Sequence, residues 1–358
     1  MSTRFSFRRV LLEVFAVLLL GALAYGVYLY RDYKRFADAP ITGIGAAAVI
    51  DVPLGAPLPV VVRLLDTYGF SSGDVYYWRL LAREMGVAGK LHAGEYALEP
   101  GLTPRKLLRK LAAGEVIQHH FTIVEGWTFA QLCKAIGEDA GLIQSLGIHM
   151  GEFTKDMSKA EAVSSVGAVV MKRLGEPEVL PEGQFLPETY SYVKGMTDFD
   201  VLRRAHEALK KELDKAWALR AADTPLTSPY QALTLASIVE KETGRADERP
   251  QIARVFLSRL KLGMKLQTDP TVIYGMGAAY DGNIRKRDLE TDTPFNTYTR
   301  YGLPPTPIAL PGKAALDAVV HPATIPALYF VARGDGSHEF SPTLEAHNRA
   351  VAKFQLHR

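Results

Sequence analysis

The sequence predicts an α+β protein with an N-terminal transmembrane helix, a small α/β module, and a larger domain that mixes helices and strands. Three observations lead to this prediction. The chain has 358 residues, of which 47% are apolar and 23% charged, an ordinary globular composition for two or three domains. An almost uninterrupted apolar run lies near the N-terminus. Segments with helical apolar spacing and short β-like segments then alternate through the remainder of the chain.

The apolar run covers residues 10–30, VLLEVFAVLLLGALAYGVYLY, and carries one charge, Glu13. At ~1.5 Å per residue it covers roughly 30 Å, enough to cross the hydrocarbon core of a bilayer. Three tyrosines near its end are typical of an aromatic belt. A cleaved signal peptide is the competing interpretation, because residues 21–24 (GALA) resemble a cleavage site. Since the apolar run continues past this point, we predict an uncleaved single-pass anchor, preceded by a short segment at residues 1–9.

Charge does not determine how this helix is oriented. Three basic residues precede the apolar run and three follow it: Arg4, Arg8 and Arg9, then Arg31, Lys34 and Arg35. The net charge of the chain is +3 with both signs mixed throughout, so we predict no nucleic-acid partner. The single cysteine, Cys133, cannot form an intrachain disulfide, so any exported domain must be stable without one.

A small α/β module is predicted at residues 58–136, after a linker at 31–57 that is rich in Pro, Gly and Ala and leads into a strand and a turn. Thr103 before Pro104 is typical of a helix start, and Gly114 of a helix stop. The module's expected elements are helices at 60–68 and 76–84, a strand at 95–98, a helix ending at Gly114, a strand at 120–124, and the helix FAQLCKAI.

Residues 137–179 are expected to form a helical connecting region, and residues 180–358 the larger domain. Within that domain, an amphipathic helix is predicted at 198–219. A β-hairpin is predicted from Leu328 to Phe340 around the turn GDGS, with a last helix beginning near Pro342.

The stretch LASIVEKET, residues 235–243, contains the candidate catalytic acids. Leu235, Ile238, Val239 and Glu242 follow one face of a helix, while Glu240 lies well round it. An acid on an apolar stripe is desolvated, which raises its pKa and suits a general acid. The alternative is a solvated helix end with two surface acids, and periodicity alone slightly favours that alternative.

Two downstream segments make a site more plausible. In LQTDPTVIYG, the side chains of Gln267, Thr268 and Asp269 can bind sugar hydroxyls or a nearby carboxyl, and Tyr274 offers an apolar face with a polar tip. In TPFNTYTRYGLPPTPIALPG, rings, prolines and Asn296 alternate and could form the wall of a cleft. Each segment could equally be a structural loop whose polar groups satisfy its own backbone.

Other chemistry is not favoured. The nine histidines are scattered and no HExxH occurs, so we predict no metal site. The short glycine motif at 275–277 lacks the strand and helix of a dinucleotide site, and we predict no cofactor. Ser237 has no GxSxG setting, which argues against a serine hydrolase.

Several long motifs, in order, resemble those of the YceG-like family of endolytic murein transglycosylases. They cover roughly residues 55–350 and comprise HAGEYALEPGLTPRKLLRKLAAGE, TIVEGWTFAQL, EGQFLPETY, LASIVEKET, LQTDPTVIYG, FNTYTRYGLPPTPI, HPA and LYFVARGDGSHEFSPTLEAHN. The resemblance implies a cell inner-membrane protein with a cytoplasmic N-terminus and periplasmic domains. It also implies that the first module is similar to LysM, a peptidoglycan-binding fold.

The resemblance further implies a lyase without cofactor or metal. Such an enzyme cleaves the MurNAc–GlcNAc β-1,4 bond inside nascent peptidoglycan strands and leaves 1,6-anhydro-MurNAc ends. One glutamate suffices, because the sugar's own C6 hydroxyl replaces water as the nucleophile. The family's catalytic glutamate aligns with Glu242, and Glu240 is expected to support it.

Five further residues are expected to line the cleft: Gln267, Asp269, Tyr274, Asn296 and Tyr298. Glu182 lies in a matched motif, but its role does not follow from spacing. Expected partners are glycan strands, the membrane through the N-terminal helix, and the cell-wall synthases near which the family works. The main alternative is a non-catalytic peptidoglycan-binding scaffold.

Overall fold

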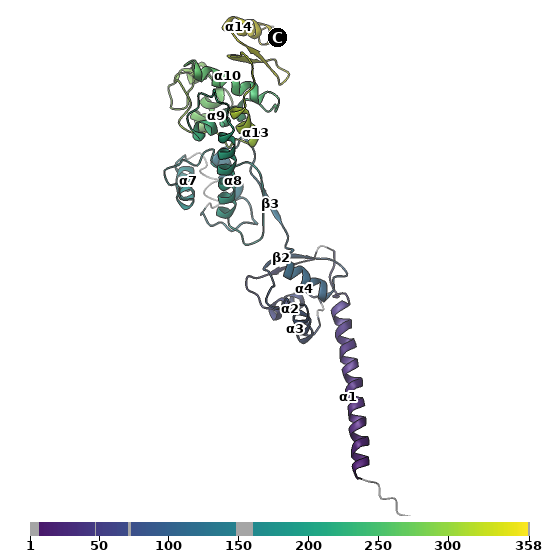
Figure 1. Ribbon diagram of the computed structural model, residues 1–358. Helices are drawn as coiled ribbons and strands as arrows, with labels where there is room; N and C mark the ends of the chain where they lie inside the picture. The colour runs from purple at the N-terminus through teal and green to yellow at the C-terminus, as the bar shows by residue number, and fades with distance from the viewer. Residues whose placement is uncertain (1–6, 47, 71–72, 148–159, 357–358) are drawn as a thin grey trace, which may run out of the picture. The chain divides into compact units, whose positions relative to one another are not determined.

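The computed structural model describes residues 7–46, 48–70, 73–147 and 160–356 (Figure 1). They form two compact units, Met1–His119 and His120–Arg358. The expected module boundary near residue 136 is therefore placed too late. The segment after His119 contributes its strand and helix to the second unit, because the apolar side chains of Phe121, Phe129 and Ile136 belong to a core of that unit.

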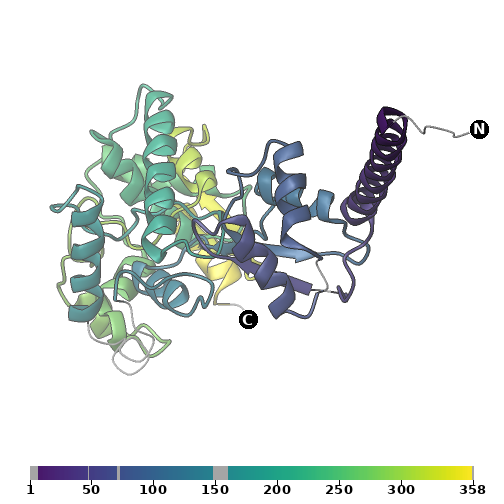
Figure 2. The same ribbon diagram turned by 90° about the horizontal axis from the view of Figure 1, so that it is seen from below.

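The first unit begins with α1, Phe7–Asp38, which appears as one long helix in Figure 1 and Figure 2. Its segment Arg9–Asp38 is long enough to cross a membrane, and the most apolar 18-residue window within it has a mean hydropathy of 2.3. The helix does not stop at residue 30 as expected. It continues for two further turns, and Tyr33 and Ala37 on those turns join the core of the first unit.

The expected linker at 31–57 contains the strand into which it was predicted to lead. β1, Ala48–Val52, pairs antiparallel with β2, Gly94–Leu98, so that Ala48 lies opposite Leu98. The strand forms because Ile50 and Val52 alternate into the core, a signal hidden among the surrounding Pro and Gly residues. The helices of the first unit are α2, Leu58–Thr67, α3, Val75–Glu84, and α4, Pro104–Ala113.

The capping signals predicted for α4 are confirmed. The Thr103 hydroxyl accepts a hydrogen bond from the backbone N–H of Lys106, and Pro104 is the first helical residue. Gly114 ends the helix with a φ of +67°, a left-handed conformation that glycine adopts without steric cost.

The second unit has two hydrophobic cores. The first is built around Phe129 and Phe185. Part of the predicted helical region at 137–179, namely residues 148–159, lies outside the described residues. Its elements are β3, His119–Thr122, paired with β4, Thr189–Tyr192, and the helices α5, Phe129–Gly137, α7, Ala160–Arg173, and α8, Asp198–Ala218.

The second core carries the site, and α9 lies at its centre. The predicted hairpin and last helix are confirmed, with Tyr329 opposite Ser341 and Thr343 capping the final helix. The elements are α9, Pro229–Glu242, α10, Arg249–Lys261, α11, Asp269–Met276, the 3-10 turn η1, Gly277–Ala279, α12, Lys286–Glu290, α13, Lys313–Val320, β5, Tyr329–Ala332, β6, His338–Ser341, and α14, Leu344–Phe354.

Candidate active site

The last residue of helix α9 is an acid that lies at the edge of the core. Ser228 caps its start by accepting a hydrogen bond from the N–H of Gln231, and Pro229 follows as the first helical residue. The eight residues from Ala232 to Val239 are all buried, so α9 is enclosed on every side rather than amphipathic. The alternative of a solvated surface helix is therefore excluded for this stretch. The helix ends at Glu242, where Thr243 becomes extended.

Glu242 faces a cavity of about 470 Å³. Although the residue is half-buried overall, desolvation raises the pKa of its carboxyl to about 7. The Thr268 hydroxyl donates to Oε1 of this carboxyl and opposes that rise in pKa, as do the neighbouring side chains of His338 and Arg259. The negative charge of Asp269 raises the pKa of Glu242 further. At neutral pH both forms of the carboxyl are accordingly populated.

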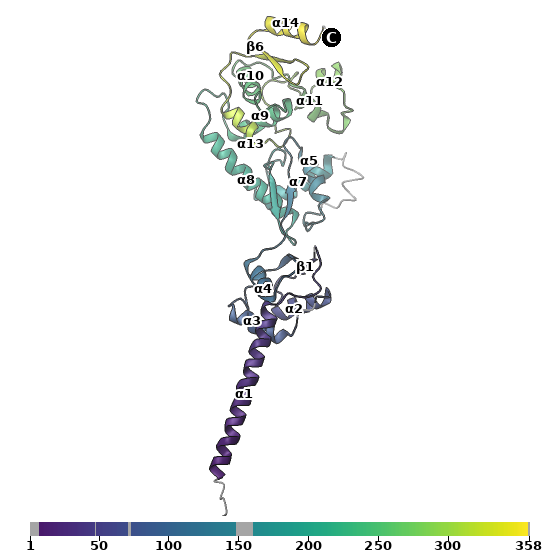
Figure 3. The same cartoon turned by 90° about the vertical axis from the view of Figure 1, so that its right-hand side faces the viewer.

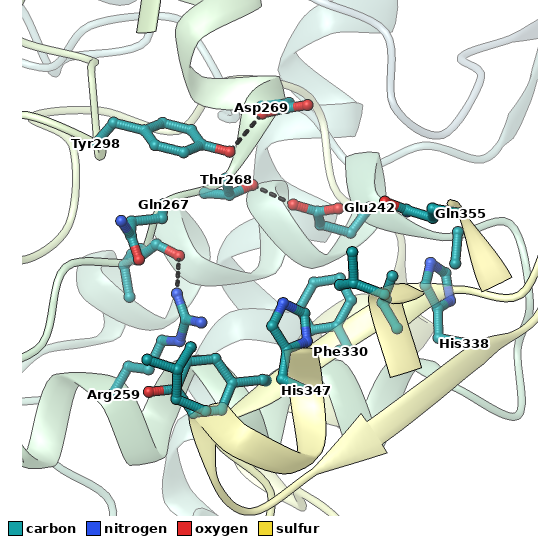
Figure 4. A pocket seen from close by; sticks show the side chains of 16 residues that line it. Glu242, Arg259, Gln267, Thr268, Asp269, Tyr298, Phe330, His338, His347 and Gln355 are labelled. Atoms are coloured by element: carbon teal, nitrogen blue, oxygen red, sulfur yellow. Dashed lines mark hydrogen bonds between the residues drawn. The ribbon is translucent and has the colours of Figure 1, made fainter. Parts of the chain in front are cut away.

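Four parts of the chain besides α9 form the walls of the cavity, one of them the loop that carries Tyr298. Arg259 comes from α10, residues 266–269 come from the segment that leads into α11, and a third wall is formed by the β5–β6 hairpin with α14 (Figure 4). The lining residues are Glu242, Arg259, Leu266, Gln267, Thr268, Asp269, Tyr298, Tyr329, Phe330, Val331, Ala332, His338, Leu344, His347, Val351 and Gln355.

The segment that carries Gln267 has an unusual backbone. Gln267 has a φ of +52°, and it is the only non-glycine residue with a positive φ in the described part of the chain. Its N–H donates to the carbonyl of Thr297 over 3.2 Å, and the N–H of Thr268 donates to the Thr297 hydroxyl over 3.1 Å. A left-handed glutamine is costly, and such residues cluster at functional sites. Here the conformation allows Gln267 and Thr268 both to face the cavity.

Tyr298 and Asp269 form a pair on one side of the cavity. The tyrosine hydroxyl donates to Oδ1 of Asp269 over 2.6 Å. Asp269 is the first residue of α11, where the helix dipole favours a negative charge. The pair therefore presents a fixed ring and a fixed carboxylate to any ligand in the cavity.

Arg259 lies beneath the hairpin wall. Its guanidinium is buried and donates to the carbonyl oxygens of Leu328, Lys265 and Leu266. It also lies over the ring of Tyr329, 5.0 Å from the centroid. These contacts attach α10 to both the hairpin and the Gln267 segment.

Two histidines complete the hairpin wall. His338 contacts Glu248 twice, through its backbone N–H at 2.9 Å and through Nδ1 at 2.6 Å. His347 stacks on Tyr329 with ring centroids 5.3 Å apart, and burial lowers its pKa. The Nδ1 atom of His347 is buried and has no hydrogen-bond partner among the residues that the structure describes. A neutral imidazole with an unused nitrogen is thus available at the cavity.

Glu240 points away from this cavity. Its Oε2 accepts the N–H of Gly312 over 2.9 Å, and its Oε1 lies 3.3 Å from Nη2 of Arg249. The side chain is 5% exposed, and desolvation raises its pKa. Glu240 therefore joins α9 to α10 and to the start of α13, and the two acids of EKE do separate around the helix.

Tyr274 and Asn296, which we expected in the cleft, do not line the cavity. Asn296 is buried because its amide donates to the carbonyls of Asp288, Leu289 and Thr291, while its Oδ1 accepts the N–H of Tyr298. The Asn296 side chain thus hydrogen-bonds to backbone groups of its own loop and thereby positions Tyr298.

Tyr274 is bound elsewhere, to Glu182. Its hydroxyl donates to Oε2 of Glu182 over 3.1 Å, and the N–H of Phe129 donates to Oε1 over 2.9 Å. Desolvation raises the pKa of Glu182 to about 7 despite these donors. Glu182 thus links α5 of one core to α11 of the other.

Sequence reasoning did not assign Arg259, His338 or His347 to the lining, whereas Thr268 was expected to bind sugar hydroxyls or a nearby carboxyl and does donate to Glu242. The two histidines lie within a recognised motif and Arg259 lies just before one, but no local pattern separates a lining residue from its neighbours. Their positions depend on how the hairpin packs on α10.

Comparisons with known proteins agree on one family. The model of the YceG-like family matches residues 50–353. An endolytic murein transglycosylase of Bacillus subtilis (strain 168) is 29% identical over 349 residues, which is 93% of this chain and 90% of that protein. One from Streptococcus pneumoniae serotype 2 (strain D39) is 28% identical over 356 residues, with 93% of this chain and 63% of that protein covered. A crystal structure of a yceG-like protein from Listeria monocytogenes has 27% identity and a TM-score of 0.49, over 84% of this chain and 98% of that chain.

Proposed function

This chain belongs to the YceG-like family, and on that premise we propose that it is a membrane-anchored lytic transglycosylase of peptidoglycan. Its curated relatives are named endolytic murein transglycosylases. The observation that carries the proposal is the desolvated carboxyl of Glu242, which faces a cavity of about 470 Å³. A cavity of this size is large enough for sugar rings.

The proposed reaction uses Glu242 twice. In its protonated form it gives its proton to the oxygen that bridges MurNAc and GlcNAc inside a nascent strand, as the bond from that oxygen to the MurNAc C1 atom breaks. The resulting carboxylate then takes the proton of the MurNAc C6 hydroxyl, whose oxygen bonds to C1. The product is a 1,6-anhydro-MurNAc end, and no water is consumed. A pKa of about 7 suits a group that must act as acid and then as base near neutral pH.

The other lining residues would bind and orient the sugar. Gln267 carries an amide that can both donate to and accept from hydroxyls, and Tyr298 offers its ring. Asp269 holds the tyrosine hydroxyl, and Thr268 holds Glu242. We assign Glu240, Asn296 and Tyr274 supporting roles, because their side chains contact the elements that carry these residues.

The first unit and the N-terminal helix complete the proposal. We assign the first unit as a LysM-like module that binds glycan strands, with α1 as a single-pass anchor in the cell inner membrane. The N-terminus would then be cytoplasmic and both units periplasmic, where glycan strands and the synthases that make them are found. The supporting observation is the apolar segment Arg9–Asp38, none of which is buried inside the protein over its most apolar window.

An ordinary hydrolase is the second candidate, and one observation favours it. Hydrolases that act on glycosidic bonds generally use two carboxylates. The cavity does contain a second one, Asp269, which could activate a water molecule. The family relationship favours the lytic reaction, but only the product distinguishes the two.

The test is product analysis with the full-length protein in detergent. Uncrosslinked nascent glycan is digested, and the fragments are analysed by mass spectrometry. Anhydro-MurNAc ends support the proposal, whereas reducing MurNAc ends would assign the protein as a hydrolase. Glycan that is bound but left uncut would support the non-catalytic scaffold.

A further inference from the structure

One helix of the first unit has an exposed face of unusual composition. On α3, Tyr76 is 70% exposed and Leu80 is 50% exposed, with Arg79 and Arg83 exposed beside them. The spacing of these four residues places them on a single face. Exposed aromatic and aliphatic side chains interleaved with arginines are typical of helices that lie on a membrane surface.

The position of this face is set by α1, which enters the first unit without a break. The apolar run ends near Tyr30, and the same helix carries Tyr33 and Ala37 into the core of the unit. At ~1.5 Å per residue, Ala37 lies roughly 10 Å beyond Tyr30 along the helix. A helix that continues without a linker holds the first unit close to wherever the apolar run ends.

The helix α3 contacts α1 immediately after the end of the apolar run. The Tyr77 hydroxyl, near the start of α3, donates to Asp32 over 2.9 Å, and the Tyr33 hydroxyl donates to Glu84 at the end of α3. Both ends of α3 therefore contact adjacent residues of α1, so α3 runs across α1 rather than along it (Figure 3). If α1 crosses the membrane, α3 lies along the membrane surface.

The exposed face of α3 is turned away from the core. Trp78, on the opposite face, packs on the ring of Phe36 with centroids 5.5 Å apart, further along α1. The core continues in that direction to Ala37 and Ile41. Tyr76 and Leu80 therefore face the other way, toward the apolar part of α1.

The charged residues around the exposed face of α3 also suit a membrane surface. Arg79 and Arg83 on α3 join the basic residues Arg31, Lys34 and Arg35, which follow the apolar run on α1. Among the nearby acids, Asp32 accepts from Tyr77, Glu84 is bonded to Tyr33 and to Arg105, and Asp74 caps α3. The exposed groups that remain are predominantly cationic, which suits the phosphates of anionic lipids.

We propose that the exposed face of α3 (Tyr76, Arg79, Leu80 and Arg83) binds the membrane surface, with the two arginines on anionic phospholipid headgroups. This inference rests on the proposed anchoring by α1. The helix α1 then does more than tether the protein, because it holds one defined face of the first unit against the bilayer. The ring of Tyr76 and the side chain of Leu80 enter the headgroup layer.

The experiment measures the depth of single labelled sites in the full chain. Leu80→Cys, Val49→Cys and Leu20→Cys each receive a nitroxide, and native Cys133 is buried and does not compete for the label. The proteins are placed in nanodiscs of phosphatidylethanolamine and phosphatidylglycerol, and spin relaxation by oxygen is compared with relaxation by a water-soluble nickel chelate. Val49, on β1, is the aqueous control, since β1 and β2 lie on the side of the first unit away from α3 (Figure 1, Figure 3).

We expect position 20 to be deep in the bilayer, position 49 to be aqueous, and position 80 to be at headgroup depth. Position 80 as aqueous as position 49, with position 20 deep, would overturn this inference and leave the anchor intact. An aqueous position 20 would instead overturn the anchor itself. Position 80 shielded from both reagents would indicate a protein partner and would also refute the inference.

The lipid partner is tested by charge reversal. In the Arg79→Glu/Arg83→Glu variant, the label at position 80 is expected to move toward the aqueous value. Nanodiscs of phosphatidylcholine alone should produce the same shift with the unmodified arginines. An unchanged depth in both cases would exclude anionic headgroups as the ligand of this face.

Discussion

The hydroxyl of Thr268 donates a hydrogen bond to the carboxyl of Glu242 and so joins the start of α11 to the end of α9. Thr268 is itself held by two buried threonines. Its N–H donates to the Thr297 hydroxyl, and its carbonyl accepts from the hydroxyl of Thr271 over 2.8 Å. Since a donor to a carboxylate stabilises the charged form, Thr268 limits the rise in pKa that burial causes at Glu242.

Removing this donor should move the pH profile. In Thr268→Val the pKa of Glu242 rises above about 7, because burial is no longer opposed. Since the acid must be protonated to act, the fall in kcat/KM on the alkaline side should shift to higher pH. Thr268→Ser keeps the hydroxyl and should keep the wild-type profile. A profile that does not move in Thr268→Val would show that Glu242 is not the titrating acid.

The opposite shift is expected for Asp269→Asn. The negative charge of Asp269 raises the pKa of Glu242, so its removal should move the alkaline fall to lower pH. The variant also weakens the contact with the Tyr298 hydroxyl, so the maximal rate should decrease. The direction of the pH shift, measured from kcat/KM between pH 5 and pH 9, separates the electrostatic effect from that loss.

The two acids of EKE should fail in different ways. Glu242→Gln is expected to lower the rate of anhydro-product formation by about 10²- to 10⁴-fold while glycan binding and thermal stability are retained. Glu240→Gln is its matched control. That variant leaves Arg249, whose Nε has no hydrogen-bond partner among the described residues, with only the carboxylate of Glu125 at 3.9 Å, and should cost about 1 to 3 kcal/mol of stability while cleavage persists. An inactive Glu240→Gln beside an active Glu242→Gln would reverse the assignment.

Strain and binding can be separated at Gln267. Gln267→Gly and Gln267→Ala both remove the side-chain amide, but only glycine relieves the left-handed backbone at a φ of +52°. Both variants should raise KM. The glycine variant should be about 1 kcal/mol more stable than the alanine variant, as judged by denaturant unfolding. Equal KM values in wild type and both variants would remove Gln267 from the binding site.

Glu182 should make the protein less stable as pH rises. Its pKa is about 7 in the folded protein and roughly 4.3 when unfolded, so the folded state binds the proton more tightly. Its contribution is then most favourable below about pH 4 and declines by roughly 3 kcal/mol as pH rises to about 7. In Glu182→Gln this part of the decline should disappear.

The measurement is urea unfolding of the full chain in detergent, followed by tryptophan fluorescence at pH 5 and pH 8. Glu242, whose pKa is also about 7, contributes a decline of the same sign, so Glu242→Gln provides an independent comparison. An identical difference between the two pH values in wild type and Glu182→Gln would show that Glu182 is already ionised in the folded protein.

Most elements of the fold could be predicted where local signals are strong. Thr103 and Gly114 bound α4 as expected, because capping depends on a few adjacent residues. The hairpin followed from the GDGS turn, and α14 begins close to Pro342 as expected, where Thr343 caps it. A strand was expected at the end of the linker and β1 lies there, but its bounds and its pairing with β2 were not predicted, because its apolar positions are few and lie among Pro and Gly. The end of α1 was placed too early, since its last two turns are stabilised by packing on the first unit rather than by the apolar run.

The sequence by itself determined that an acid ends an apolar helix and that Gln267, Thr268 and Asp269 form one polar segment. Only the tertiary structure decided that Thr268 contacts Glu242, that Glu240 contacts Arg249 and Gly312, and that Asn296 serves its own loop. The physical reason is the range of the interactions. Helix caps and turns are made within a few residues of the chain, whereas these contacts join elements that come together only when the core packs around α9.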